Sequence, residues 1–354
     1  MVAEQIDLLN YTQYQIAQIY FDNTDWPGNN IKYWKHKNGK WRWILFDTDF
    51  GFGIWNDFNF NNNTLRFALQ SNGPSWPNPP WSTLLFRQLM ENDGFKKSFI
   101  NTFADELNTR FEPTKVKAKI NANAQVIRSE MSRQITRWRE TNFENWLNKI
   151  NAMRNFADRR QVIMRNIIQS EFDLPAQRAV QLQIDDLDAG SIQLNSLRIE
   201  ETDWRGTYFE SVPITMTAIP KEGYVFDHWS GLISTTEESI TVDLTSPSIS
   251  IFKANFRVND STTSTEAVNI LKQYIQIAPN PVVDELFVNI ALPKLEFINI
   301  ELLDSSGKRI QSNNISKEVL KEQFKLDMSL LPKGPYWVRV SVGTQQIVEQ
   351  VIKL

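Results

Sequence analysis

The pattern of apolar and polar residues changes character partway along the 354-residue chain. Apolar residues recur at helical spacing through most of residues 4–170, and Leu9, Ile16 and Tyr20 fall on one face of the first such segment. From residue 176 onward they alternate in short runs such as VQLQI, ITMTAIP and SISIFKANF, which is typical of β-strands. The pattern therefore predicts a helical region followed by β structure.

Turn-forming residues divide the helical region into separate helices, because Asp-Gly and Glu-Pro pairs stand between the apolar segments. The helices expected are residues 4–21, 82–90, 95–111, 115–139 and 144–170. Residues 54–80 are dense in Asn, Pro and Gly and are expected to be a loop.

Two groups of side chains in this region allow alternative interpretations. Trp55, Trp76 and Trp81 could form a sugar-stacking platform or pack a long loop onto its domain. The arginines of the last two helices, Arg160 and Arg165 among them, could dock an acidic substrate. They more readily form solvated faces balanced by acidic neighbours.

The β structure is expected in two parts. Residues 174–257 are predicted to form a small all-β domain, and residues 258–273 a polar linker. Residues 274–354 contain strand runs such as ELFVNIAL and YWVRVSV at the spacing of a β-sandwich. The predicted fold class is therefore multidomain α+β, with the helical domain in residues 1–173.

One β-hairpin is predicted inside the helical region, at residues 31–46. Two runs rich in aromatic and β-branched residues flank the tetrapeptide HKNG. Asn-Gly between such runs favours a type I′ turn, because this turn needs positive φ at both central residues. With residues 38–39 as the turn, Tyr33 lies opposite Ile44.

The open end of this hairpin gathers carboxylates and an amide. The same register places Asn30 beside Asp47, and Asp49 lies on the same side as Asp47 because side chains alternate along a strand. Asp25 precedes Asn30 by five residues, in a loop that proline and glycine force to turn. Crowded carboxylates repel unless a cation or a proton separates them, and oxygen ligands suit magnesium. The alternative is that these residues only form turns.

Composition narrows the chemistry further. A net charge of −3 gives no electrostatic reason to expect a nucleic-acid partner, and the absence of cysteine excludes disulfides and thiolate zinc sites. The two histidines, His36 and His228, are expected in different domains, so a Ser-His-Asp triad is not expected. No apolar run is long enough for a transmembrane segment, and the first residues show no signal peptide.

Residues 4 to about 172 resemble the CotH-type kinase family of atypical secreted or spore-coat protein kinases. The matching words are YQIAQIYFDNTDWPGNNIKYW and WRWILFDTDFGFG. The resemblance implies a mostly helical, kinase-like C-lobe with the β-hairpin at a site that uses ATP and Mg²⁺. Asp25 and Asn30 match the spacing of a kinase catalytic loop. Asp25 would then orient or deprotonate the substrate hydroxyl, and Asn30 would hold a metal.

The metal-binding aspartate implied by this resemblance is Asp47 or Asp49. Asp49 begins the literal Asp-Phe-Gly motif of kinases, whereas the hairpin register favours Asp47, which we prefer. A kinase N-lobe, with its glycine-rich loop and phosphate-gripping lysine, does not fit before Asp25. The chain is therefore expected to be an N-terminally truncated piece of a longer kinase.

Two further resemblances concern the β regions. GYVFDHWSG is similar to the bacterial repeat domain of the internalin B-repeat type. APNPVVDELFV and LDMSLLPKGPYWVRV are similar to the C-terminal sorting domain of the type IX secretion system of Bacteroidetes-like bacteria. This implies a secreted or outer-surface protein that crosses the periplasm, with the type IX machinery as a partner of residues 275–354.

The function expected is transfer of the ATP γ-phosphoryl group to a Ser or Thr hydroxyl of a protein substrate. The alternative is a non-catalytic, surface-displayed adhesion or scaffold protein with a degenerate kinase fold. A weaker interpretation is a glycan-active enzyme that uses Asp25 and Asp47 as a carboxylate pair.

Overall fold

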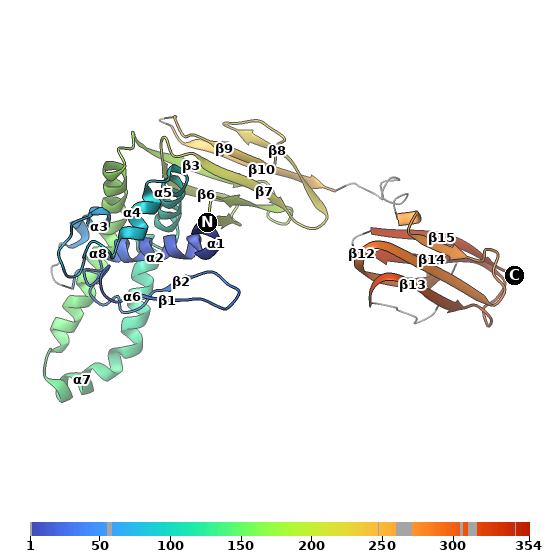
Figure 1. The fold of residues 1–354 in the computed structure, drawn as a ribbon, viewed down its shortest axis with the longest axis horizontal. Helices are drawn as coiled ribbons and strands as arrows, with labels where there is room; N and C mark the ends of the chain where they lie inside the picture. The colour runs from blue at the N-terminus through green and yellow to red at the C-terminus, as the bar shows by residue number, and fades with distance from the viewer. Residues whose placement is uncertain are drawn as a thin grey trace. The chain divides into compact units, whose positions relative to one another are not determined.

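The computed structural model describes residues 2–54, 59–246, 248–259, 271–304, 307–310, 317–343 and 345–354. The chain divides into two compact units, residues 1–258 and 259–354. In Figure 1 the first unit runs from blue to yellow and the second from orange to red. The linker expected at residues 258–273 lies largely outside the described residues.

The first unit begins with the predicted helical region. Its helices are α1 (Val2–Gln5), α2 (Leu8–Phe21), α3 (Thr64–Leu69), α4 (Leu84–Met90), α5 (Asp93–Asn108), α6 (Pro113–Ile127), α7 (Met131–Trp138) and α8 (Phe143–Glu171). Short 3₁₀ turns occupy Asn59–Asn61 and Arg128–Glu130. Figure 1 shows α6 beside α8, with α7 at their far end. The predicted helices are present, but two of them are divided. The helix expected at residues 4–21 is interrupted at Ile6 and Asp7, between α1 and α2, and the one expected at residues 115–139 is interrupted by the 3₁₀ turn between α6 and α7.

Polar capping residues explain where these helices begin. Asn92 and Asn142 accept hydrogen bonds from the backbone N–H groups three residues later, at the starts of α5 and α8. Asn63 caps α3 in the same way, by accepting from the N–H of Arg66 at 2.8 Å. The asparagine-rich segment that was expected to be a loop therefore contains a helix, because one of its asparagines is a cap.

The β part of the first unit forms two four-stranded sheets. The first has the order β6 (Asp203–Phe209), β3 (Gln177–Ile184), β10 (Ser250–Val258), β8 (Tyr224–Gly231). The second has the order β5 (Leu197–Ile199), β4 (Gly190–Leu194), β7 (Ile214–Pro220), β9 (Ser239–Val242). β10 pairs with β3 in parallel and with β8 antiparallel. Alternate residues of β10 are buried, as the period of a strand requires.

The helices and these sheets share one hydrophobic core. A buried carboxylate, Asp105 of α5, ties the two parts together. It accepts hydrogen bonds from Tyr208 Oη at 2.6 Å, from Ser196 Oγ at 2.6 Å and from Ser196 N at 3.0 Å. Burial raises the pKa of Asp105, and the bonds from Ser196 and Tyr208 oppose that rise. The change from helix to strand near residue 174 therefore occurs inside one packed unit.

The second unit is a single five-stranded sheet made of β11 (Ile275–Ala278), β12 (Glu285–Leu303), β13 (Lys317–Asp327), β14 (Gly334–Val342) and β15 (Gln345–Lys353). The long strand β12 pairs with β11, β13 and β14, and its register against β13 shifts between Ala291 and Glu296. Residues from both halves of β12 enter one core, so the sheet curls around it. The predicted multidomain α+β class is confirmed. Among the described helices, none combines the length and the apolar character that crossing a bilayer requires.

The contacts of Asp105 predict a large effect on stability. Asp105→Ala leaves the buried hydroxyl of Tyr208 without its acceptor, and we expect a loss of about 3 kcal/mol in the free energy of unfolding. Urea unfolding followed by tryptophan fluorescence measures this for the first unit, since Trp337 is the one tryptophan after residue 258. Lys97→Ala, at an exposed position of the same helix, should change stability by less than about 0.5 kcal/mol. Equal effects of the two substitutions would contradict the assignment.

Candidate functional site

The candidate site begins where α2 ends. Asp22 adopts a left-handed backbone conformation with φ of 58°, and its N–H bonds the carbonyls of Gln18 and Ile19, which terminates the helix. Asn23 donates to Gln18 Oε1 at 2.8 Å and accepts from the N–H of Asp25 at 3.1 Å. These local bonds fold the loop against α2 and fix the backbone of Asp25, which is buried.

Arg160 of α8 is fully buried behind this corner. Its guanidinium donates to the carbonyl oxygens of Ile19 at 2.9 Å and Tyr20 at 3.0 Å, and to Thr64 Oγ1 at 3.0 Å. It also donates to the carbonyls of Phe60 and Asn62. The carbonyl groups at the end of α2 lack partners within the helix, and a side chain from a distant helix donates hydrogen bonds to them instead.

Asp22 completes this buried network. Its carboxylate accepts from Asn62 Nδ2 at 2.9 Å and from Thr64 Oγ1 at 2.5 Å. Burial raises the pKa of Asp22, while the charge of Arg160 opposes the rise. Burial lowers the pKa of Arg160 to about 10, and Asp22 opposes that change. The expectation that Arg160 belongs to a solvated face is wrong, because this arginine serves backbone carbonyls rather than water.

The Asp25 carboxylate is held by two neighbouring amides. Asn29 Nδ2 donates to its two oxygens at 3.0 and 2.9 Å, and Asn30 Nδ2 donates to Oδ2 at 2.5 Å. The five-residue spacing therefore brings Asp25 and Asn30 into direct contact. Asn29 was not among the predicted site residues, although the Asn-Asn pair in the sequence is the signal that could have identified it. With its nitrogen on Asp25, Asn30 keeps its Oδ1 for another partner.

The predicted hairpin is present, but its register is wrong by one residue. β1 (Lys32–Trp34) pairs with β2 (Arg42–Ile44), and Tyr33 lies opposite Trp43 rather than Ile44. The connection is longer than a type I′ turn, because neither of residues 38–39 has positive φ. Instead, the N–H of Gly39 donates to the carbonyl of His36 at 2.9 Å.

The N-terminal segment explains this longer connection. The N–H of Trp41 donates to the carbonyl of Gln5 at 2.7 Å, and the N–H of Asp7 donates to the carbonyl of Trp41 at 3.0 Å. Trp41 thus pairs with the chain before α2 and not with the other arm of the hairpin.

The ladder ends before the predicted site residues are reached. Asn30 and Asp47 both have left-handed backbones, with φ of 53° and 52°. The pairing of Asn30 with Asp47 that the predicted register required is therefore wrong.

Asp47 and Asp49 form an acidic pair near the loop that carries Asp25. Both are exposed. Partial desolvation raises the pKa of Asp47, the hydrogen bond and charge of Asp49 raise it further, the charge of Asp25 adds to the rise, and Lys32 opposes it. Asp47 is therefore within electrostatic reach of both Asp49 and Asp25.

Tethers to α2 explain why the Asp47–Gly53 segment stays near Asp25. Thr24 Oγ1 donates to the carbonyl of Phe50 at 3.5 Å, and the N–H of Phe52 donates to the carbonyl of Phe21 at 2.8 Å. A Cβ atom on Gly51 would lie 2.6 Å from that Phe21 oxygen, so only glycine fits the close approach.

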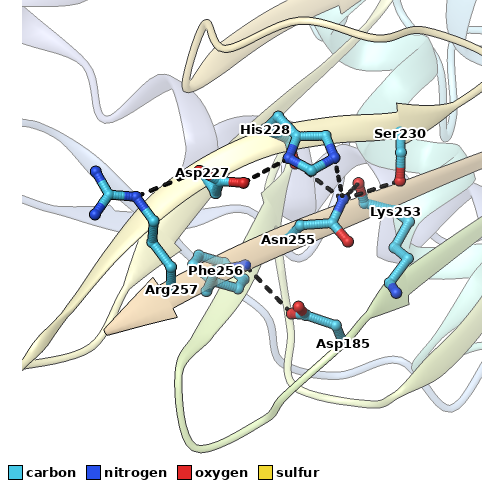
Figure 2. A network of polar contacts seen from close by, with 8 residues as sticks. All are labelled: Asp185, Asp227, His228, Ser230, Lys253, Asn255, Phe256 and Arg257. Atoms are coloured by element: carbon cyan, nitrogen blue, oxygen red, sulfur yellow. Dashed lines mark hydrogen bonds and ion pairs between the residues drawn. The ribbon is translucent and has the colours of Figure 1, made fainter. Parts of the chain in front are cut away.

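A second polar cluster surrounds His228 in the first β sheet (Figure 2). His228 Nδ1 lies 2.7 Å from Asp227 Oδ2, and Nε2 lies 3.4 Å from Asn255 Nδ2. Asn255 Nδ2 also donates to Ser230 Oγ at 2.9 Å and so stands between the imidazole and this hydroxyl. The cluster does not have the hydrogen-bond order of a catalytic triad.

The remaining candidate residues do not gather at one point. Within the described residues, no three or more His, Cys, Asp or Glu side chains are grouped as they would be around a metal ion. Trp76 and Trp81 are 59% and 63% exposed, and Trp55 lies outside the described residues. The site therefore consists of two neighbouring pairs, Asp25 with Asn30 and Asp47 with Asp49.

Comparisons with known families agree with the motifs. Residues 1–164 match the family described as CotH kinase protein, residues 202–260 match the Divergent InlB B-repeat domain, and residues 276–354 match the Secretion system C-terminal sorting domain. The chain thus combines a CotH-type region, a B-repeat-like region and a sorting domain, as predicted. The sorting domain points to secretion and the cell surface.

The other comparisons add little. No curated protein matches the chain. Among solved structures, the chain is similar to the crystal structure of dimeric latent PorU from Porphyromonas gingivalis, with 12% identity and a TM-score of 0.20. The similarity covers 47% of this chain and 16% of that chain, and a TM-score of 0.20 defines no shared fold.

The buried network predicts a specific requirement for arginine at residue 160. Arg160→Lys keeps the charge but loses the planar set of donors. We therefore expect the free energy of unfolding to fall by about 3 kcal/mol. Arg159→Lys, at the exposed neighbouring position, is the matched control and should change stability by less than about 0.5 kcal/mol. Chemical denaturation of both variants tests this. A stable Arg160→Lys variant would show that the five hydrogen bonds donated by Arg160 contribute little.

Proposed function

We propose that this chain belongs to a secreted or cell-surface atypical protein kinase, and that its residues 1–173 form a kinase-like C-lobe that takes part in transfer of the ATP γ-phosphoryl group, with Mg²⁺, to a Ser or Thr hydroxyl of a protein. The observation that carries the proposal is the contact between Asp25 and Asn30, at the spacing of a kinase catalytic loop, with Asp47 within electrostatic reach of Asp25 and hydrogen-bonded to Asp49. The match of residues 1–164 to the CotH kinase family supports it.

The proposed roles follow from what each group has left to bond. Asp25 is buried and oriented by two amides, so it can accept a hydrogen bond from an acceptor hydroxyl and take its proton as the phosphoryl group transfers. Asn30 offers its Oδ1, and Asp47 offers an exposed carboxylate. Asp49 shares this role, and we keep Asp47 as the preferred ligand.

The residues present suit a magnesium ion that keeps several waters better than a metal ion whose ligands all come from the protein. Mg²⁺ usually keeps several waters and binds one or two carboxylates together with substrate phosphates. An exposed pair such as Asp47 and Asp49 provides that number of ligands. Desolvation, together with the hydrogen bond and charge of Asp49 and the charge of Asp25, raises the pKa of Asp47, and a cation would offset the negative charge. When bound, the ion would neutralise charge on the phosphates during transfer. Lys32, which opposes the rise in the pKa of Asp47, is a nearby cation of this chain.

A second function is favoured by a different observation. Several large side chains of the hairpin are exposed, including Tyr33 at 58% and Trp34 at 48%. Exposed aromatic groups of this kind often mark a binding surface. A non-catalytic adhesion or scaffold protein with a degenerate kinase fold would use such a surface without the Asp25 site.

Substitution of the proposed metal ligand separates these two functions. We expect Asp47→Asn to weaken Mg²⁺-dependent ATP binding at least about tenfold, because one ligand charge is removed. Isothermal titration of the full chain with ATP, with and without Mg²⁺, measures the loss. Asp158→Asn removes an exposed carboxylate from α8 and should leave binding unchanged. ATP binding that does not depend on Mg²⁺ or on Asp47 would refute the assignment.

The C-terminal module supports a prediction about sorting. We infer a domain division into residues 1–173, 174–257, a linker at 258–273, and a sorting domain at 274–354 that engages the type IX secretion machinery.

Deleting residues 275–354 should leave the protein in the periplasm of a host that has this machinery, because the machinery would no longer recognise it. Cell fractionation with antibody detection locates the protein, and surface display of the deleted form would overturn the inference.

A further inference from the structure

A cavity of 460 Å³ opens next to the loop that carries Asp25. Its volume is in the range of small-molecule sites. Its walls come from α2, the loop after it, the β1–β2 hairpin and the start of α4. The residues that matter here are Gln15, Asn29, Asn30, Tyr33 and Trp81.

Two aromatic rings at this cavity are unusually exposed. Trp81 is 63% exposed and Tyr33 is 58% exposed. Tyr33 is nevertheless held by its neighbours, since its ring centroid lies 5.5 Å from that of Trp41 and 5.7 Å from that of Trp43. A flat apolar surface that is fixed before binding is suited to a ring-shaped ligand, because little freedom is lost when the ligand stacks on it.

One wall of the cavity carries a buried acceptor with no partner. Gln15 is 5% exposed, and its Oε1 makes no hydrogen bond within the described part of the chain. Buried polar atoms are normally satisfied, so an unpaired oxygen beside a cavity indicates a ligand that donates a hydrogen bond there.

The cavity is also neutral. Among the described residues that line it, none carries a charge. Its polar groups are amides and hydroxyls. A phosphate or carboxylate would find no counter-charge on these walls. A ligand that offers a flat C–H face and several hydroxyls fits them better.

We propose that this cavity binds a neutral sugar ring of a glycan, stacked on Trp81 and Tyr33, with one hydroxyl donating to Gln15 Oε1. This does not rest on the proposed phosphoryl transfer, because recognition of the sugar needs neither Mg²⁺ nor ATP.

The test is titration of the full chain with neutral disaccharides, namely cellobiose, maltose and N,N′-diacetylchitobiose, followed by tryptophan fluorescence and saturation-transfer NMR. At least one should bind saturably. Trp81→Ala should weaken that binding at least about tenfold, the loss typical of a central aromatic contact. Gln15→Leu keeps the side-chain volume and removes the acceptor, so it should also weaken binding while the protein stays folded.

Trp76→Ala is the matched control, because Trp76 is 59% exposed and does not line the cavity. It should bind the sugar like the unchanged protein. Asp47→Asn should also bind normally, so failure of the kinase proposal and failure of this one are distinguishable. The proposal is overturned if no disaccharide binds, if Trp81→Ala binds as well as Trp76→Ala, or if adenosine alone occupies the cavity.

Discussion

The site depends on one buried cation. Arg160 reaches from α8 to the end of α2 and bonds the carbonyls that the helix leaves unpaired, while Asp22 compensates its charge through shared partners. Burying a guanidinium has a large unfavourable desolvation free energy. Hydrogen bonds offset it only when all its donors have acceptors in fixed positions. The loop that carries Asp25 starts at this point. Its geometry is therefore set by a helix that lies more than a hundred residues further along the chain.

A second constraint is the balance of charge around Asp25. Amides, not cations, hold this carboxylate, and its charge contributes to the raised pKa of the nearby Asp47. Amide donors fix the position of a carboxylate without neutralising it. The site thus keeps net negative charge, which favours a divalent cation. The neutral, aromatic cavity beside it has the opposite character, so the two adjoining surfaces are suited to different ligands.

Local patterns predicted much of this molecule, whereas contacts between distant segments escaped them. Most helix positions followed from apolar periodicity and turn-forming residues, and the spacing of Asp25 and Asn30 pointed to their contact. The hairpin register failed because Trp41 pairs with Gln5, a partner that no turn propensity can reveal. Arg160 was misjudged for the same reason, since a charged residue on a helix is ordinarily solvated. Its partners are backbone carbonyls, which carry no signature in the sequence.

The buried bonds of Asp105 have a practical consequence for dissecting this protein. The β-strands that follow residue 174 do not form an independent module, because Tyr208 and Ser196 complete the polar interior of the helical half. A recombinant fragment that stops at residue 173 would present an open apolar face and an unpaired carboxylate to solvent. Fragments meant for crystallisation or grafting should instead end after residue 258, where the first compact unit ends.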